Sequence, residues 1–339
     1  MGLLLLGGVV LAGWIVARVV RERFSFAGKS VLITGGSRGL GLVIARQICA
    51  EGGRVALLAR DARELHRARD ELSKEGGEAI TIVCDLLDRG QAEAAIEEVI
   101  DRFGGVDVLI NNAGIIEVGP LSHMKREDFE KSMNLHFWAP FTLIWKVVPH
   151  MRRRGGGRIV NISSIGGKMA VPHLAPYCAS KFALVGLSDS MRAELALDDI
   201  LVTTVTPGLM RTGSHVNARF KGHHAAEYTW FSVSASFPLG SIDAEHAAKR
   251  IVEACRQGQP ALIIPLAARV GITSNALFPN LTGRVMKLVN RLLPRATDSS
   301  GDELRSGWQS RASLSERGWL RRFTDRAAER NNESSSDAR

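Results

Sequence analysis

Two side chains that can exchange a proton, Tyr177 and Lys181, stand four positions apart in the sequence. On a helix this spacing puts both side chains on one face, so they can share one site. A free phenol has a pKa near 10, but an adjacent ammonium favours the phenolate and brings that pKa down. The pair therefore predicts an acid–base centre that works near neutral pH. The alternative is an exposed helix pair without a function.

The position of the pair relative to Ser164 favours a function. Ser163 and Ser164 end an apolar run that reads as a strand, and Tyr177 begins the next helical stretch. In open α/β folds the carboxyl edge of the sheet is where ligands bind. We therefore expect the serine, the phenol and the amine to meet at that edge.

A glycine-rich turn follows the first predicted strand and precedes a helical stretch over residues 42–49. Glycine is needed there because the turn is tight, the backbone approaches a pyrophosphate closely, and the helix starts against the strand. The amides and the helix dipole then hold the anion. The turn predicts a dinucleotide site that includes Gly35, Ser37, Arg38, Gly39, Leu40 and Gly41.

The end of the second predicted strand indicates which dinucleotide is preferred. An acidic side chain there would bind the ribose hydroxyls and repel a 2′-phosphate. This sequence has Arg60 instead, and Arg38 adds a second cation that could flank the same phosphate. NADP(H) is therefore favoured over NAD(H). Asp61 leaves NAD(H) open, and both arginines could simply be solvated surface charges.

These groups need a scaffold that brings strand ends together. Between residues 29 and 265 short apolar runs alternate with helical stretches, which predicts a Rossmann-type doubly wound α/β domain with a seven-stranded parallel sheet. It would be a single domain with an N-terminal apolar helix and a C-terminal helical tail. The expected strands are Ser30–Thr34, Arg54–Ala59, Ala79–Cys84, Val106–Asn111, Arg158–Ile162, Ile200–Thr206 and Leu262–Pro265.

Further motifs make residues 27–265 resemble the short-chain dehydrogenase/reductase family. They occur in the family's order and on the matching elements. They are Asn111-Asn112-Ala113-Gly114, Met133-Asn134-Leu135, Ser163-Ser164, Tyr177-Cys178-Ala179-Ser180-Lys181, and Pro207-Gly208 with Thr212.

The resemblance implies roles for individual residues. Tyr177 would donate a proton to the developing alkoxide while hydride leaves the nicotinamide, Ser164 would orient the same oxygen, and oxidised nicotinamide would help Lys181 favour the phenolate. Asn134 would hold a water that connects Lys181 to solvent, although it could simply bond within its helix. On the cofactor side the resemblance adds Asp85 at the adenine amino group, Asn112 on the adenosine side, and Pro207, Gly208 and Thr212 near the nicotinamide carboxamide.

The expected substrate is a hydrophobic alcohol or ketone, such as a lipid, steroid-like compound, retinoid or aldehyde. The family builds its pocket from segments that here are residues 115–121, 165–174 and a flap over 209–240. Aromatic residues give the flap an apolar character, unless they pack it onto the body: Phe220, Tyr228, Trp230, Phe231 and Phe237. Two alternatives are a 3-oxoacyl thioester reductase and a non-catalytic NADPH-binding membrane scaffold.

The two ends of the chain suggest a membrane. Residues 2–17 carry no charge and are followed by Arg18, Arg21 and Arg23, so residues 1–23 are expected to anchor the protein with the catalytic domain on the cytoplasmic side. The alternative is a helix packed on the protein surface. Residues 266–296 contain a basic amphipathic helix that would lie in the interface or pack on protein. The tail over 297–339 is polar and expected to be partly disordered, with Trp308, Trp319, Leu320 and Phe323 docking back.

The remaining composition excludes other classes of function. The net charge of +9 comes without the aromatic and basic pattern of a nucleic-acid platform, so no nucleic acid is expected as partner. The histidines show no ligand spacing, and no metal is expected. Four separated cysteines indicate neither zinc nor disulfides. By resemblance the chain forms a homo-oligomer, a dimer or a tetramer.

Overall fold

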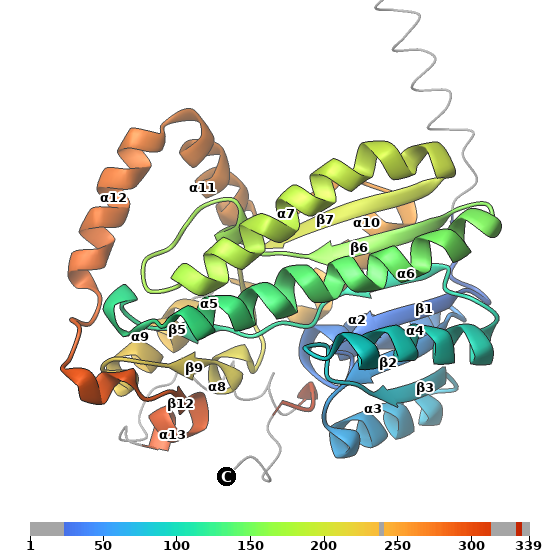
Figure 1. The fold of residues 1–339 in the computed structure, drawn as a ribbon, viewed down its shortest axis with the longest axis horizontal. Coiled ribbons are helices and arrows are strands. Elements are labelled where there is room, and N and C mark those ends of the chain that lie inside the picture. Colours follow the sequence, from blue (N-terminus) through green and yellow to red (C-terminus); the bar gives the residue numbers. More distant parts are fainter. Residues whose placement is uncertain (1–23, 237–240, 313–329, 334–339) are drawn as a thin grey trace, which may run out of the picture.

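Seven apolar runs form one parallel sheet in the computed structural model, which describes residues 24–236, 241–312 and 330–333. The expected seven-stranded parallel sheet is confirmed, and its order is β11-β7-β6-β4-β1-β2-β3 (Figure 1). Every β-strand pair in this sheet is parallel, because each connection crosses over through a helix. The strands are β1 (Ser30–Thr34), β2 (Arg54–Ala59), β3 (Glu78–Val83), β4 (Val108–Asn111), β6 (Gly157–Ile162), β7 (Ile200–Pro207) and β11 (Ala261–Ile264).

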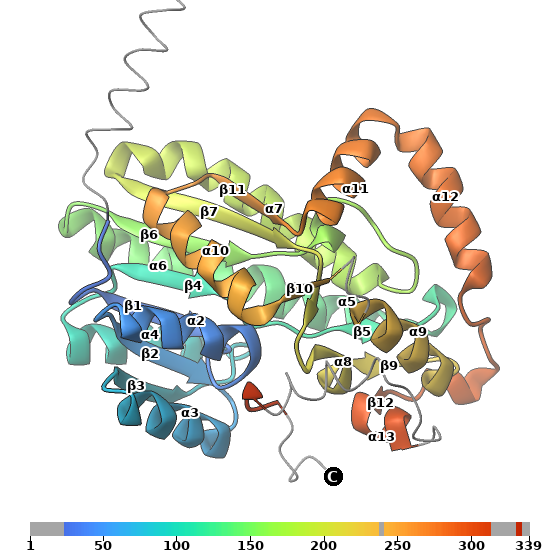
Figure 2. The ribbon, with the colours of Figure 1, turned by 180° about the vertical axis from the view of Figure 1, so that it is seen from behind.

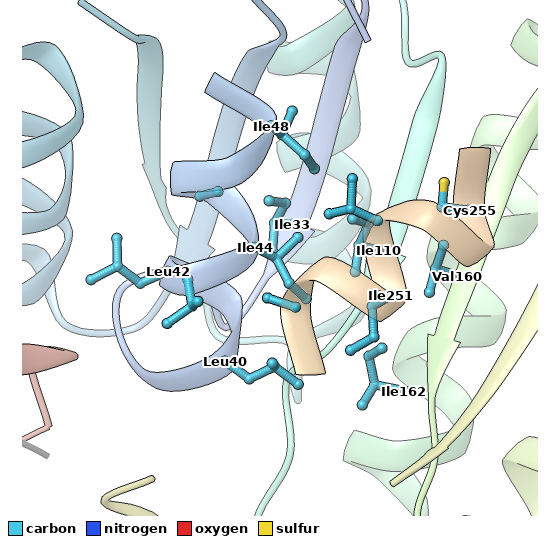
Figure 3. Packing of buried hydrophobic residues seen from close by; sticks show 14 of the residues in the cluster. Ile33, Leu40, Leu42, Ile44, Ile48, Ile110, Val160, Ile162, Ile251 and Cys255 are labelled. Atoms are coloured by element: carbon cyan, nitrogen blue, oxygen red, sulfur yellow. The ribbon is translucent and has the colours of Figure 1, made fainter. Parts of the chain in front are cut away.

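Two layers of helices cover the two faces of this sheet, as Figures 1 and 2 show from opposite sides. One face packs against α2 (Gly39–Ala50), α3 (Ala62–Lys74) and α10 (Ala244–Gln257). The other packs against α4 (Arg89–Phe103), α6 (Ala139–Arg153) and the end of α7 (Ala175–Leu195). In the first layer Ile44 and Ile48 lie near Ile33 and Ile110 of the strands, with Ile251 beside them (Figure 3).

The topological switch point lies between β1 and β4, which are neighbours in the sheet although β2 and β3 separate them in the sequence. The connections leave these two strands in opposite directions, and such a divergence leaves a crevice at the carboxyl edge. A buried polar chain holds the next strand and α7 in register: Asn111 Nδ2 donates to Asn161 Oδ1 at 2.8 Å, and Asn161 Nδ2 donates to Ser188 Oγ at 2.8 Å.

Shorter elements connect β4 to β7. They are β5 (Glu117–Val118), the 3-10 turn η1 (Leu121–His123), α5 (Arg126–Met133), the π-helical turn η2 (Asn134–Trp138), and the 3-10 turns η3 (Ile165–Gly167) and η4 (Ala196–Asp198). The π-helical turn joins α5 directly to α6, so the three form one interrupted helix. This interruption changes which side chains face the sheet edge.

The flap after β7 is packed onto the body by its own aromatic residues. It contains β8 (Leu209–Arg211), α8 (Ser214–Asn217), β9 (Arg219–Phe220) and α9 (His224–Ser236), and β10 (Ser241–Asp243) pairs with β8. Phe220, Tyr228 and Phe231 are buried in one cluster. Phe220, Tyr228 and Phe231 therefore follow the alternative prediction, in which the aromatic residues pack the flap onto the body. Phe237 lies outside the described residues.

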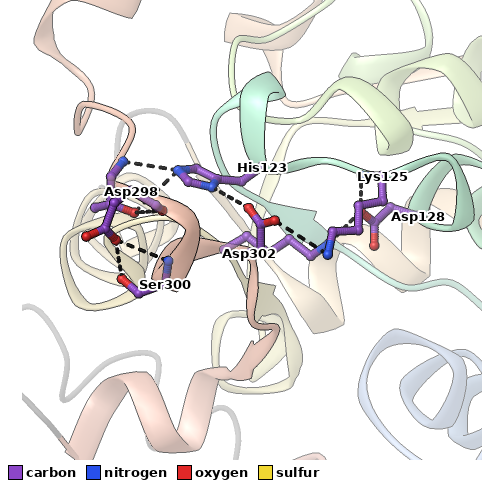
Figure 4. Close-up of polar contacts among 8 residues, drawn as sticks. His123, Lys125, Asp128, Asp298, Ser300 and Asp302 are labelled. Atoms are coloured by element: carbon purple, nitrogen blue, oxygen red, sulfur yellow. Dashed lines mark hydrogen bonds and ion pairs between the residues drawn. The ribbon is translucent and has the colours of Figure 1, made fainter.

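The segment after residue 296 docks against this flap. It forms η5 (Ser299–Asp302), β12 (Arg305–Ser306), which extends the β9–β5 sheet, and α13 (Gly307–Ala312). His123 is the main attachment: its Nδ1 lies 2.9 Å from Asp302 Oδ1, and its Nε2 accepts from the Thr297 amide at 3.0 Å (Figure 4). Trp308 packs on the aromatic cluster, as expected. Trp319, Leu320 and Phe323 lie outside the described residues.

Helices α11 (Leu266–Leu277) and α12 (Pro279–Leu292) form an arm that projects from the body (Figure 2). The expected amphipathic helix is confirmed, and none of its residues is buried. Leu281, Leu288 and Leu292 are 60%, 57% and 81% exposed, so an apolar face is left open to the surroundings. The predicted anchor over residues 1–23 lies outside the described residues. Within the described ranges, no helix combines the length and the apolar character that crossing a membrane requires.

Candidate active site

The glycine-rich turn has the backbone geometry that only glycine tolerates. Gly35 has φ +63°, and a Cβ on Gly41 would lie 2.2 Å from the Gly35 carbonyl oxygen. Asn112 fixes the turn from the neighbouring strand end, because its Nδ2 donates to the carbonyl of Thr34 at 3.0 Å. Asn112 thus supports the loop itself. Its predicted contact with the adenosine side stays a prediction.

Glu64 of α3 binds two side chains of the turn. Its Oε1 accepts from Arg38 Nη1 at 2.8 Å, and its Oε2 accepts from Ser37 Oγ at 3.0 Å. Glu64 is 6% exposed, so its carboxylate is sheltered from solvent, whereas the Arg38 side chain is 38% exposed. Sequence reasoning missed Glu64, since it reads as one more charge on a charged helix. The charge of Arg38 is therefore largely balanced within the protein.

The end of β2 presents one cation to the cavity. Arg60 is exposed and lines the cavity beside Asp85 of the loop after β3. Asp61 is the N-cap of α3 and accepts from the Glu64 amide at 2.9 Å, which helps to keep the pKa of its carboxyl below the usual value. A carboxylate that caps a helix is less available to the ribose hydroxyls of NAD(H), so the geometry favours the prediction of NADP(H), which rests on Arg60.

Ser164, Tyr177 and Lys181 line one cavity of about 1250 Å³ together with the glycine-rich turn. The Ser164 hydroxyl acts to lower the pKa of the Tyr177 phenol, and its Oγ accepts from the Gly166 amide at 3.1 Å. Lys181 is buried, its Nζ donates to the Ile162 carbonyl at 2.8 Å and lies 5.8 Å from the centre of the Tyr177 ring. The three predicted residues therefore converge at the carboxyl edge of β6.

The pKa of Tyr177 differs from the expected direction. Burial raises the pKa of the Tyr177 phenol to about 12, with the Ser164 hydrogen bond acting weakly against it. Burial also lowers the pKa of Lys181 to about 7. The expected lowering by a neighbouring ammonium is wrong for the protein alone, because desolvation of the buried phenol dominates its pKa. At neutral pH the site holds a protonated phenol, which is a proton donor.

Asn134 is not among the residues that line this cavity, and its predicted role in holding a water stays a prediction. Its side chain is exposed and lines a separate cavity with Trp138 and Phe141. Residues two apart on a helical turn point to nearly opposite sides, and Asn134 begins the π-helical turn. His136 lies two positions further and is fully buried at the site instead.

His136 connects the loop after β4 to α7. Its Nε2 accepts from the Ile115 amide at 3.0 Å, and its Nδ1 lies 2.7 Å from Ser180 Oγ. Ser180 Oγ in turn donates to the Tyr177 carbonyl at 2.9 Å, and the imidazole meets the Tyr177 ring edge-on at 5.6 Å between centres. Burial, reinforced by the charge of Lys181, drives the pKa of His136 well below 6.5, so the ring is neutral. A proton on Nδ1 then fits both contacts.

The remaining predicted residues follow β7. Pro207, Gly208 and Thr212 all line the cavity, and Thr212 Oγ1 accepts from the Ser214 amide at 3.2 Å. All three segments expected to form the substrate pocket contribute to it. The arm adds Val289, Leu292 and Leu293, a contribution that the sequence did not predict.

Known proteins agree with this geometry. The family model described as short chain dehydrogenase matches residues 29–221, more than half of the 339 residues. The chain belongs to the short-chain dehydrogenase family.

The relatives of this short-chain dehydrogenase include bacterial reductases. An uncharacterized oxidoreductase of Mycobacterium bovis is 40% identical over 55% of this chain, and the match spans only 56% of that relative. A ketoacyl reductase of Nostoc is 32% identical, with 81% of this chain and 88% of the relative covered. A fatty acyl-CoA reductase of Acinetobacter baylyi is 30% identical, with 89% and 95% covered.

A solved structure shares the fold. L-sorbose reductase from Gluconobacter frateurii, complexed with NADPH and L-sorbose, superposes with a TM-score of 0.65 at 28% identity. The match covers 72% of this short-chain dehydrogenase and 97% of that chain.

The described residues fit a dinucleotide. The glycine-rich turn leaves no room for side chains at Gly35 and Gly41, and α2 begins there with its amides directed at the cavity edge. A carboxyl group of the protein already lies at this position, because the Gly213 amide donates to Glu333, whose side chain lies against Gly39. A bound nicotinamide dinucleotide would supply or accept the hydride.

Proposed function

We propose that this protein is an oxidoreductase that uses NADP(H) to interconvert a hydrophobic carbonyl compound and its alcohol. The observation that carries the proposal is the convergence of Ser164, Tyr177 and Lys181 on the cavity that the glycine-rich turn also lines. A proton donor, an oxygen-orienting hydroxyl and a dinucleotide cradle in one cleft are the parts that carbonyl reduction requires.

The proton chemistry follows from the state of Tyr177. A phenol with a pKa of about 12 is protonated throughout the physiological range, so it can donate its proton to the substrate oxygen as negative charge develops there. Ser164 would donate a second hydrogen bond to that oxygen. Lys181, with a pKa of about 7, can take up or release the proton that Tyr177 exchanges. The site is thus set for reduction.

The preference for NADP(H) rests on charge. Arg60 faces the cavity at the end of β2, where a 2′-phosphate would lie, and the nearby Asp61 is engaged as a helix cap. The NADPH complex of the related sorbose reductase supports the same cofactor. NAD(H) is the less favoured alternative.

The hydrophobic substrate is inferred from the far end of the cavity. Its lining there is apolar and comes from the flap, the loop after β6 and the arm: Val171, Leu174, Met210, Trp230, Phe231 and Leu292. Such a surface gains free energy from an apolar ligand. A lipid, steroid-like, retinoid or aldehyde substrate fits this lining.

A 3-oxoacyl thioester is the second candidate substrate. The Nostoc ketoacyl reductase and the Acinetobacter fatty acyl-CoA reductase, which both align over most of this chain, favour it. Such a substrate would need its bulky thiol carrier outside and its acyl chain inside the cleft.

A turnover screen of the detergent-solubilised full chain with NADPH tests the proposal. The panel contains retinoids, ketosteroids, aldehydes and 3-oxoacyl thioesters. Tyr177→Phe should reduce turnover by about 10²–10⁴-fold, the usual contribution of a positioned acid, while NADPH still binds. Tyr228→Phe is the matched control, because it removes the other tyrosine hydroxyl from the flap cluster. Near-normal turnover in Tyr177→Phe would contradict the role of Tyr177 as the acid, and no turnover by the wild type on any member of the panel would favour the non-catalytic NADPH-binding membrane scaffold.

A membrane is the proposed partner, with the catalytic domain on the cytoplasmic side. The uncharged residues 2–17 followed by arginines support it, as do the exposed leucines of α12 with Arg284, Lys287 and Arg291 on the same helix. Alkaline carbonate washing of membranes checks the anchor: wild type should stay in the pellet, and Val9→Asp with Leu11→Asp should be released.

A homo-oligomer, a dimer or a tetramer, is the proposed assembly. Trp138 and Trp145 are 53% and 68% exposed on one helical stretch and sandwich Phe141 between their rings. A second copy would remove this aromatic surface from water. Light scattering should show a multiple of the chain mass that Trp145→Glu reduces.

A further inference from the structure

The C-terminal segment Arg330–Glu333 lies on the glycine-rich turn, although 295 positions separate Asn332 from Ser37 in the sequence. The Gly39 amide donates to the Asn331 carbonyl at 2.8 Å, and Asn332 Nδ2 donates to the Ser37 carbonyl at 2.8 Å. The segment is the short red trace beside the loop before α2 in Figure 2. Its backbone and side chains therefore use the polar groups of the turn itself.

Side chains of two helices hold the segment in place. Arg46 of α2 donates to the Asn331 side chain at 3.0 Å and to the Arg330 carbonyl at 2.8 Å. Arg67 of α3 donates to Asn332 Oδ1 at 3.0 Å. Asn331 is fully buried, so the contact is a built site and not a loose surface encounter.

Glu333 places a carboxylate where the fold holds anions. It is 7% exposed and lines the cavity. It accepts from the Gly213 amide, and a Cβ on Gly39 would lie 3.0 Å from its Oε1, so it bridges the two walls of the cleft. The first turn of α2 has no acidic residue of its own. The helix amides and dipole that attract a pyrophosphate thus face Glu333.

We propose that residues 330–333 are a built-in competitor of the dinucleotide, docking on the glycine-rich turn with the Glu333 carboxylate in the place of the pyrophosphate. This inference rests on the proposed function for the identity of the dinucleotide. The Gly39 and Gly213 amides cannot serve the tail and a pyrophosphate together, so binding of one displaces the other. The protein binds NADPH fully only after its tail has left the cleft.

Docking also depends on pH. Burial raises the pKa of Glu333 to about 7, opposed by the Gly213 amide and Arg38 and assisted by Glu64, the charged groups that face it from the turn and α3. At a pH near 7 the Glu333 carboxyl binds a proton when the tail is docked and is deprotonated when the tail is free. Protons therefore favour the docked state, and docking strengthens as the pH falls through 7. Between pH 8 and pH 6 the docking constant should rise about tenfold.

Titration of the full-length protein with NADPH, followed by nicotinamide fluorescence, tests the competition. If the tail is docked in about nine molecules of ten, Glu333→Ala should tighten the dissociation constant roughly tenfold. Glu303→Ala is the matched control, since that glutamate is an exposed residue of the same C-terminal region. Between pH 8 and pH 6, the NADPH affinity of the wild type should also fall more than that of Glu333→Ala. The variant serves as the reference here, because its affinity changes only with the protonation of the NADPH phosphate groups.

A second measurement does not depend on that variant. After removal of residues 330–339, a synthetic peptide of residues 327–339 should weaken NADPH binding, and the same peptide with Glu333→Ala should not. Unchanged or weaker NADPH affinity in Glu333→Ala, with binding otherwise intact, overturns the competition alone. Folded wild-type and Glu333→Ala proteins that both fail to bind NADPH would overturn the proposed function, and the competition with it.

Discussion

Different substitutions of His136 should remove, one at a time, the two contacts by which its ring holds the active site together. One ring nitrogen accepts from the Ile115 amide in the loop after β4, and the other contacts Ser180, which bonds the Tyr177 carbonyl. A glutamine amide reaches the position of Nε2, and an asparagine amide reaches that of Nδ1. His136→Gln therefore keeps the Ile115 contact and loses Ser180, whereas His136→Asn does the reverse.

The size of each effect follows from burial. His136 is 0% exposed, so an orphaned donor beside it is not solvated by water. Leaving a buried hydrogen-bonding group unsatisfied costs about 1–3 kcal/mol. Each single substitution should lower the free energy of unfolding by that amount, and His136→Ala, which loses both bonds and leaves a cavity, by about 3–5 kcal/mol.

The two substitutions should differ in kinetics. His136→Asn frees the loop at residues 113–115, which lines the cavity next to the glycine-rich turn, so the KM for NADPH should rise more than kcat falls. His136→Gln loosens the start of α7 at Tyr177, so kcat should fall more than KM changes. Urea unfolding and steady-state kinetics on the same preparations measure both quantities.

One result would refute this reasoning. A neutral, buried imidazole whose pKa lies well below 6.5 has no titration between pH 6 and 9, so its role is positioning. If the wild-type rate shows a step in that range that both His136→Gln and His136→Asn abolish, the imidazole is an acid or base. Equal effects of the two substitutions on kcat and KM would likewise contradict the separate contacts.

Two other predictions address single charges. Arg60→Asp should shift the ratio of the kcat/KM values from NADPH toward NADH, because a carboxylate at this position repels the 2′-phosphate and binds ribose hydroxyls. Unchanged selectivity in steady-state assays would show that Arg60 does not determine the choice of cofactor. Lys181→Met should remove a pH dependence of the free energy of unfolding. The pKa of Lys181 is about 7 in the folded protein and 10.5 in the unfolded chain, so the unfolded chain binds more protons between these values. In urea unfolding, the free energy of unfolding of the wild type should therefore rise from pH 7 to pH 9 by about 2 kcal/mol relative to the variant. A constant difference would contradict the lowered lysine pKa.

Local patterns in the sequence predict the fold well. The strands are continuous apolar runs because both faces of the sheet are covered, and the glycine-rich turn is visible because its backbone excludes side chains. The same is true of Tyr177 and Lys181, whose separation is one helical turn. Each signal lies within a few consecutive residues.

Long-range features left no such signal. The sequence does not single out His136, because the π-helical turn, which decides which side chain faces the site, cannot be read from side-chain spacing. In the sequence Glu64 looks like an ordinary surface glutamate, because its contact with Arg38 forms only through the packing of α3 against the turn. Residues 330–333 lie far in sequence from the residues they contact: 265 positions separate Asn332 from Arg67, and 120 separate Glu333 from Gly213. A polar tail without periodicity gives no hint of its partner.

The acid–base residues are tied to one another through a single strand–helix unit. The Lys181 amine bonds the last carbonyl of β6, Ser163 Oγ donates to the Lys181 carbonyl at 3.1 Å, and Ser164 and Tyr177 belong to the same stretch of chain. Much of the surface that would select a substrate lies elsewhere, on the flap and the arm. Mutational drift can therefore remodel what the protein accepts while its reaction chemistry is inherited intact.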